Sequence, residues 1–200
     1  MHLDSLVTSL DLLATFAFAI VGARIAASRN MDYGGIALIA SVASISGGTL
    51  RNLFLGQTPP WLSHPWLFAS ILLAVILTIA SKERASVGRF FLSLDTFGLA
   101  VATVSSTSFA ISLNVNFVAS VILGLIGGVT GGLLRDVLCQ VEPVLLHRET
   151  IGTSCLAGSV VYATLADFGA STLIASLVAG AVVISVRELS IKFNWNLPRI

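Results

Sequence analysis

Two short stretches place an arginine just after paired glycines, inside long apolar segments. The first is Ser46-Gly47-Gly48-Thr49-Leu50-Arg51-Asn52 and the second is Thr130-Gly131-Gly132-Leu133-Leu134-Arg135-Asp136. An arginine in a membrane-spanning helix costs about 2.5 to 3.5 kcal/mol at the bilayer centre, so an ionisable residue there usually serves a function. Interrupted apolar segments at corresponding positions are typical of broken helices at a transport site. The two stretches therefore predict the movement of something small and polar across a bilayer.

Main-chain carbonyls at such breaks can replace part of the hydration shell of an ion. We therefore expect a transient site for a monovalent cation at the paired glycines and their polar neighbours. These residues are Gly47, Gly48, Gly131 and Gly132, with Ser46, Thr49 and Thr130 beside them. Close helix packing is the alternative, because Gly124, Gly128 and Gly132 form a ridge of small residues at four-residue spacing. Packing alone does not require a neighbouring arginine, so helix breaks are the preferred interpretation for the two pairs.

Two aspartates are candidates to neutralise the arginines. Asp11 lies about five residues inside the first apolar segment and Arg51 about five residues inside the end of the second, so both lie roughly 8 Å below the same membrane edge. Asp95 and Arg135 repeat this arrangement at the other face, where Asp136 adds a second carboxylate. We predict the ion pairs Asp11–Arg51 and Asp95–Arg135. The alternative is that the two aspartates are simply favoured near helix starts by the helix dipole.

The composition predicts an all-α integral membrane protein that must position these residues. Of 200 residues 56% are hydrophobic and 10% charged, and the mean hydropathy is +0.94, whereas soluble domains are about 25% charged. The net charge of +1 gives no field that would attract nucleic acid. Apolar runs predict one transmembrane domain over residues 1–200, with seven transmembrane helices near 6–27, 34–56, 66–81, 90–112, 117–139, 146–166 and 170–190.

Several landmarks recur at one constant offset in residue number, which predicts a duplication. They are Leu10-Asp11 with Leu94-Asp95, the two Gly-Gly pairs, Arg51 with Arg135, and Pro59 with Pro143. The first repeat would cover 6–81 and the second 90–166, with 170–190 as an extra span. Because each repeat holds an odd number of spans, the second must enter the membrane from the opposite face. An inverted repeat places its broken helices, here spans 2 and 5, face to face around one polar passage.

The basic residues predict an orientation. Of the eleven Lys and Arg residues, all but Arg51 fall on the side of the carboxyl terminus once the spans alternate. Positive residues favour the cytoplasmic side. We therefore expect a multi-pass protein of the cell (inner) membrane, surrounded by the lipid bilayer, with its amino terminus outside and its carboxyl terminus in the cytoplasm.

The chain resembles the prokaryotic trimeric intracellular cation (TRIC) channels over nearly its whole length. The resemblance rests on the seven spans, on an early Asp-Leu followed by Thr-Phe-Ala-Phe-Ala at 15–19, and on the two Gly-Gly-x-x-Arg stretches. It implies a homotrimer in which each protomer has its own pore, lined by kinked spans 2 and 5, that passes monovalent cations such as potassium. The family pattern has three glycines and an Arg-Asp pair, whereas this chain has Ser46, Thr130 and Asn52 at three of those positions.

Two other functions are alternatives to a cation channel: a carrier and an intramembrane enzyme. A carrier of a small zwitterion such as glycine would use helix amino termini and arginine for the carboxylate. An intramembrane hydrolase would need a nucleophile with a base, or a metal cluster, and His2, His64 and His147 have no such spacing. We therefore expect no enzyme activity and no cofactor. The Thr-Val-Gly-Tyr-Gly filter is absent, so permeation of K⁺ or Na⁺ would be weakly selective.

Overall fold

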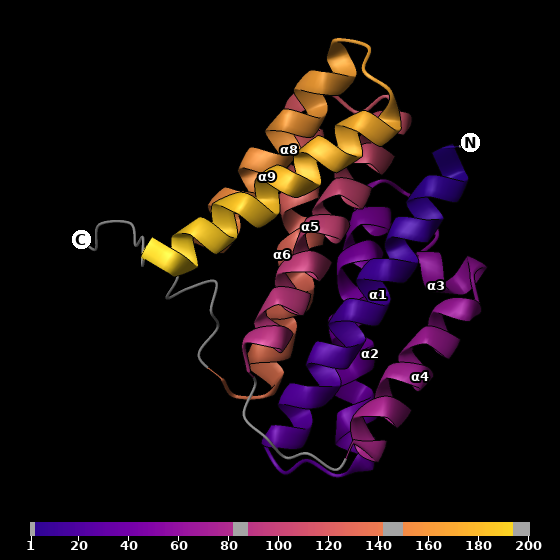
Figure 1. Ribbon diagram of the computed structural model, residues 1–200. Coiled ribbons are helices and arrows are strands. Elements are labelled where there is room, and N and C mark those ends of the chain that lie inside the picture. The colour runs from indigo at the N-terminus through magenta and orange to yellow at the C-terminus, as the bar shows by residue number, and fades with distance from the viewer. Residues whose placement is uncertain (1–2, 82–87, 142–149, 194–200) are drawn as a thin grey trace.

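The computed structural model describes residues 3–81, 88–141 and 150–193, and the secondary structure in these ranges is entirely helical (Figure 1). The helices are α1 (Leu3–Ser28), α2 (Tyr33–Phe54), α3 (Pro60–Ser63), α4 (Trp66–Ala80), α5 (Arg89–Ser112), α6 (Phe117–Leu138), α8 (Thr150–Asp167) and α9 (Thr172–Phe193). Five of them, namely α1, α2, α5, α6 and α9, are long and apolar enough to cross a membrane. The predicted all-α, multi-pass membrane protein is confirmed.

Each predicted span overlaps one of these helices, although residues 146–149 of the sixth span lie outside the described residues. The apolar helix α4 has only 15 residues, and a span of the hydrocarbon core needs about 20. The number of helices that cross the bilayer therefore stays a prediction. The four-residue helix α3 lies in a segment that the sequence predicts as a connecting loop.

The backbone repeats its local geometry at the offset of the sequence landmarks. Helices α2 and α6, at 33–54 and 117–138, begin and end at the same offset that separates Asp11 from Asp95. Each is capped by a side chain that accepts a hydrogen bond from a first-turn N–H group: Asp32 from Gly35 at 2.7 Å and Asn116 from Ala119 at 2.9 Å. Such capping satisfies a donor that the helix itself leaves free. The two cap positions are related by this offset as well.

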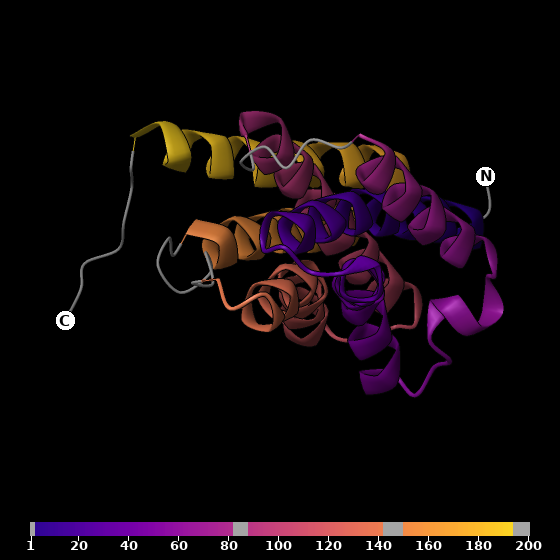
Figure 2. The ribbon, with the colours of Figure 1, turned by 90° about the horizontal axis from the view of Figure 1, so that it is seen from below.

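The helices form two groups of three with one added helix. Helices α1, α2 and α4 pack together, as do α5, α6 and α8, while α1 packs on α5 and α2 on α6 between the groups. Helix α9 lies against α8 and α5 (Figure 1). Viewed from below, α2 and α6 are seen nearly end-on beside each other (Figure 2).

The predicted helix breaks are not confirmed, because α2 and α6 run as uninterrupted helices through their glycine pairs. A Cβ atom on Gly47 would overlap the carbonyl oxygen of Gly127, and one on Gly131 would overlap the carbonyl oxygen of Ala43. These two glycines therefore let the backbones of α2 and α6 approach each other closely. Close packing of this kind compensates for the roughly 1 kcal/mol by which each glycine weakens a helix.

Candidate functional site

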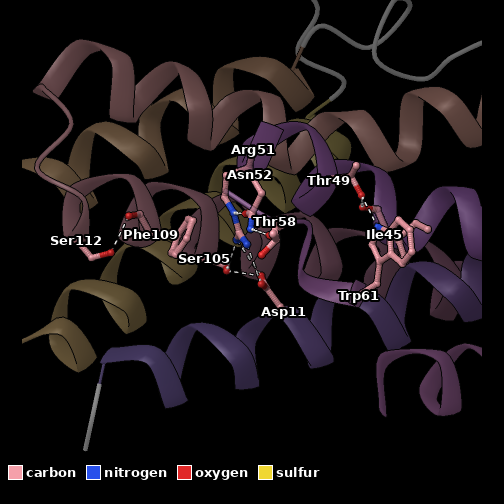
Figure 3. Close-up of polar contacts among 10 residues, drawn as sticks. All are labelled: Asp11, Ile45, Thr49, Arg51, Asn52, Thr58, Trp61, Ser105, Phe109 and Ser112. Atoms are coloured by element: carbon pink, nitrogen blue, oxygen red, sulfur yellow. Dashed lines mark hydrogen bonds and ion pairs between the residues drawn. The ribbon is translucent and has the colours of Figure 1, made fainter. Parts of the chain in front are cut away.

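Arg51, in the last turn of α2, is the centre of a buried polar cluster on one side of the molecule (Figure 3). Its two terminal nitrogens donate to the two carboxylate oxygens of Asp11 on α1, at 3.0 and 2.9 Å. The guanidinium also donates to the Ser105 hydroxyl at 3.0 Å and to the Asn52 amide oxygen at 2.8 Å, and lies 4.6 Å from the centre of the Phe109 ring. A forked arginine–carboxylate contact is among the stronger ion pairs in proteins.

A second cluster surrounds Arg135 near the end of α6. Arg135 donates to Asp95 of α5 at 2.6 Å and to its neighbour Asp136 at 2.8 Å. The other carboxylate oxygen of Asp95 accepts from Arg187 of α9 at 3.0 Å, and Arg187 also donates to the Thr96 hydroxyl at 2.8 Å. The structure thus brings together the residues of both expected charge pairs and adds a third arginine.

Arg187 is a site residue that sequence reasoning missed. It lies three residues inside the end of the span expected over 170–190, so the rule that intramembrane charges are functional would have selected it. The repeat did not suggest it, because α9 lies outside the duplicated part. The side chain is 2% exposed, and an arginine so buried requires a partner.

Counting only the charged side chains that the structure describes, both clusters are electrically neutral when fully ionised. The first pairs one arginine with one aspartate, whereas the second pairs Arg135 and Arg187 with Asp95 and Asp136. The carboxylates are the more accessible partners: the Asp11 side chain is 14% exposed against 2% for Arg51, and Asp95 is 12% exposed against 4% for Arg135. In each of these two pairs the carboxylate side chain is thus more exposed than its arginine, although Arg51 also lines a cavity beside its cluster and Arg135 lines a cavity beside the other.

Three cavities lie at and between the two clusters: the first is lined in part by α2, the second by both α2 and α6, and the third in part by α6. A vestibule of about 230 Å³ lies outside Arg51, a central cavity of about 30 Å³ lies between α2 and α6, and a third of about 20 Å³ adjoins Arg135. We call the third one the inner cavity. Asp11 lines both the vestibule and the central cavity. A water molecule needs roughly 10–15 Å³ by this measure, so the two smaller cavities each have room for only one or two waters.

The residues predicted to surround a passing cation are divided among these cavities. Gly47, Gly48 and Gly131 line the central cavity, and Gly132 lines the inner one. The three polar neighbours are not among the described residues that line either cavity; they are Ser46, Thr49 and Thr130. The hydroxyls of Thr49 and Thr130 instead donate to carbonyls of their own helices at 2.7 and 2.5 Å.

The segment around α3 folds back against α2 and covers part of the central cavity. The Trp61 indole donates to the Thr49 hydroxyl at 3.1 Å, and the Asn52 amide donates to the Thr58 carbonyl at 2.5 Å (Figure 3). Pro60 lies beside Gly48 and lines the cavity. Sequence reasoning missed this cover, because an aromatic residue near a span end is usually an interfacial anchor.

The described residues contain no group of three or more His, Cys, Asp and Glu side chains that could hold a metal ion. The buried ionic groups of the two clusters already bind one another.

A family model described as "Glycine transporter" matches the chain twice, over residues 8–83 and 92–167. The chain belongs to this family. The two matches are related by the same offset as the sequence landmarks and the paired helices.

Curated relatives are membrane proteins of similar length. The inner membrane protein YadS of Escherichia coli (strain K12) is 30% identical over 197 residues, covering 96% of this chain and 95% of its own. A membrane protein of Vibrio cholerae is 30% identical over 197 residues, covering 97% of this chain and 82% of its own. Both are described as UPF0126 proteins.

Solved structures of TRIC channels have the same fold. The TRIC orthologue from Rhodobacter sphaeroides has a TM-score of 0.88 and 30% identity, covering 94% of this chain and 98% of that chain. A structure described in terms of conductance through TRIC cation channels has a TM-score of 0.85 and 32% identity, covering 96% and 95%. The resemblance to TRIC channels is confirmed. These structural relatives are channels rather than enzymes.

Proposed function

We propose that this protein is a channel for monovalent cations, K⁺ and Na⁺, with a pore inside each protomer of a homotrimer. The pore runs between α2 and α6 and is related in its two halves by an inverted repeat. The observation that carries the proposal is the series of three cavities in which Asp11 lines the vestibule and the central cavity, the central cavity lies between α2 and α6, and Asp95 lines the inner cavity. The match to structures described as TRIC cation channels supports the same function.

The charge clusters remove the main objection to a cation pathway that contains buried arginines. A free guanidinium would repel a cation, but Arg51 and Arg135 are neutralised by Asp11, Asp95 and Asp136. The side chains of Asp11 and Asp95 are more exposed than the arginines with which they pair, and carboxylates attract cations and repel anions. We therefore expect cations to be strongly preferred over anions, with weak discrimination between K⁺ and Na⁺.

A glycine carrier is the second candidate, favoured by the description of the family model. The central cavity has a volume of about 30 Å³, which is room for about two water molecules. A glycine molecule has several heavy atoms where water has one, so it would require α2 and α6 to separate. The close backbone contacts at Gly47 and Gly131 oppose such a separation.

One pair of measurements on the same purified protein distinguishes the two candidates. Single-channel recording in a planar bilayer with KCl should show discrete openings whose reversal potential follows the cation gradient. Uptake of radiolabelled glycine into vesicles should not exceed that of empty vesicles. Saturable glycine uptake without discrete openings would instead identify a carrier and overturn the proposal.

A further inference from the structure

We propose that the Phe18 side chain is the hydrophobic constriction of the pathway, separating the central cavity from the inner cavity and gating ion passage by excluding water. The inference rests on the proposed channel function. Of the described residues that line either cavity, Phe18 alone lines both. The side chain is 3% exposed and belongs to α1, which packs on both α2 and α5.

The neighbours of Phe18 place its ring where the central helices meet. A Cβ atom on Gly98 of α5 would lie 3.4 Å from the ring, and one on Gly131 of α6 would lie 3.5 Å from it. Glycines at both positions leave room for an aromatic ring in the middle of the molecule. The ring therefore lies between the central cavity and the inner cavity that Arg135 also lines, and it offers no polar atom to an ion or to water.

The repeat shows that an aromatic ring occupies this position in only one of its two halves. The offset that relates Asp11 to Asp95 relates Phe18 to Ala102, which lines the central cavity. The large ring on α1 thus has a methyl group as its counterpart on α5, and the space that the second copy leaves open is part of the central cavity. This asymmetry assigns the constriction to the Arg135 side of the central cavity.

A ring in this position would act by controlling hydration. Hydrophobic constrictions block ions by expelling water even where the geometric gap is small. Neither neighbouring cavity holds more than about two waters, so a continuous file of water requires the ring to move. Rotation of one aromatic side chain would then connect the two cavities without any unwinding of α2 or α6.

The test combines current with accessibility, using silver ions as a thiol-reactive monovalent cation. In a background lacking Cys139 and Cys155, one reporter is Ser44→Cys in the central cavity and the other is Leu99→Cys in the inner cavity. Phe18→Ala should raise open probability several-fold and make each reporter reactive from both sides. Phe18→Leu, which keeps more of the packing, should show a smaller change in the same direction.

Phe97→Ala is the matched control, because Phe97 is on α5 with 39% of its surface exposed and lines neither cavity. Folded Phe18 variants with unchanged open probability and unchanged one-sided reactivity would overturn the constriction. If neither the wild-type protein nor Phe18→Ala passes current but Phe18→Ala still makes both reporters reactive from both sides, the channel proposal fails while the constriction stands. If neither current nor reactivity changes, the constriction is wrong.

Discussion

At the scale of single residues, the site consists of arginines whose charge is cancelled within hydrogen-bonding distance. Arg51 and Arg135 are 1% and 4% exposed, so neither can rely on solvent for its stabilisation. Removing one member of a buried pair leaves an uncompensated charge, at a cost of about 3 to 5 kcal/mol for complete burial. The two clusters differ in size, and they therefore make different predictions.

In the first cluster, Asp11→Asn and Arg51→Gln should each destabilise the protein, and the double variant should lose less than the sum. The carboxylate has Arg51 as its ion-pair partner, so most of the cost of each single change is the charge left behind. We expect a coupling of about 0.5 to 3 kcal/mol in unfolding measurements in detergent. Asp11→Asn with Arg187→Gln, which lies in the other cluster, is the control and should be additive. Additivity in both pairs would show that Asp11 and Arg51 do not depend on each other.

In the second cluster, Arg187→Gln should partly rescue Asp95→Asn. Among the side chains that the structure describes, Asp95→Asn alone leaves Arg135 and Arg187 with Asp136, a net charge of +1 in a buried site. Removing Arg187 restores neutrality and keeps the Arg135–Asp136 contact of 2.8 Å. Thermal melting in detergent should therefore place the double variant above Asp95→Asn. Lys192→Gln is on the same helix but exposed, and it should give no rescue. A double variant less stable than Asp95→Asn would refute this charge balance.

The ion pairs were predictable because depth along a helix follows directly from residue number. Asp11 and Arg51 were placed at one depth by counting alone, and the repeat carried the same inference to Asp95 and Arg135. Arg187 required knowledge of which face of α9 lies against α5, and that depends on packing outside the repeat. Phe18 was equally hidden, because one aromatic residue among several in an apolar helix has no distinguishing spacing.

At the scale of helices, glycine acts through packing rather than through unwinding. A low helix propensity shows that something must compensate, but it does not show what. Here the compensation is the contact of α2 with α6 at Gly47 and Gly131. The sequence therefore singled out stretches at which α2 and α6 approach each other closely, but the helix breaks that it predicts there are not confirmed. It also missed α3, since a four-residue helix has too little periodicity to detect.

Within the first pair, Gly47→Ala and Gly48→Ala should behave differently. A Cβ on Gly47 would overlap the Gly127 backbone, which cannot move without separating α2 from α6, whereas a Cβ on Gly48 would lie 3.4 Å from Pro60. We expect Gly47→Ala to lower the melting temperature clearly. Gly48→Ala should melt close to the wild type but carry less current, because its methyl group would narrow the central cavity. Equal melting temperatures for the two variants would contradict the close approach of the helices.

At the scale of the whole molecule, one constant offset in residue number links sequence, backbone and family match. A repeat survives in the sequence where it fixes caps, charges and close contacts, so those landmarks were enough to predict it. The side of the membrane on which each end lies was inferred from basic residues. Four of these, Arg24, Arg51, Arg135 and Arg187, are buried in the protein, and the other seven of the eleven all fall on the side of the carboxyl terminus in the predicted topology.

The inverted topology can be tested by labelling single cysteines with an impermeant reagent on whole cells. Gln57 and Asn114 are exposed in connections that should lie outside, while Asn30 and Gly88 are exposed in connections that should lie inside. We expect the first two to react in intact cells and the last two only after permeabilisation. The background variant lacking Cys139 and Cys155 is the control. Reaction of cysteines at positions 57 and 30 from the same face of the membrane would contradict the topology.

We propose that cations cross inside each protomer, between α2 and α6. The decisive measurement is the single-channel current through Ser44→Cys protein, in the background without Cys139 and Cys155, during exposure to silver ions. Ser44 lines the central cavity, and replacing its oxygen by sulfur hardly alters its size. The account predicts that the current falls in three equal, irreversible steps, one for each protomer of a trimer, whereas Ser112→Cys at the exposed end of α5 leaves it unchanged. A current that persists after Ser44→Cys has reacted, or that vanishes in a single step, would contradict a separate pore in each protomer.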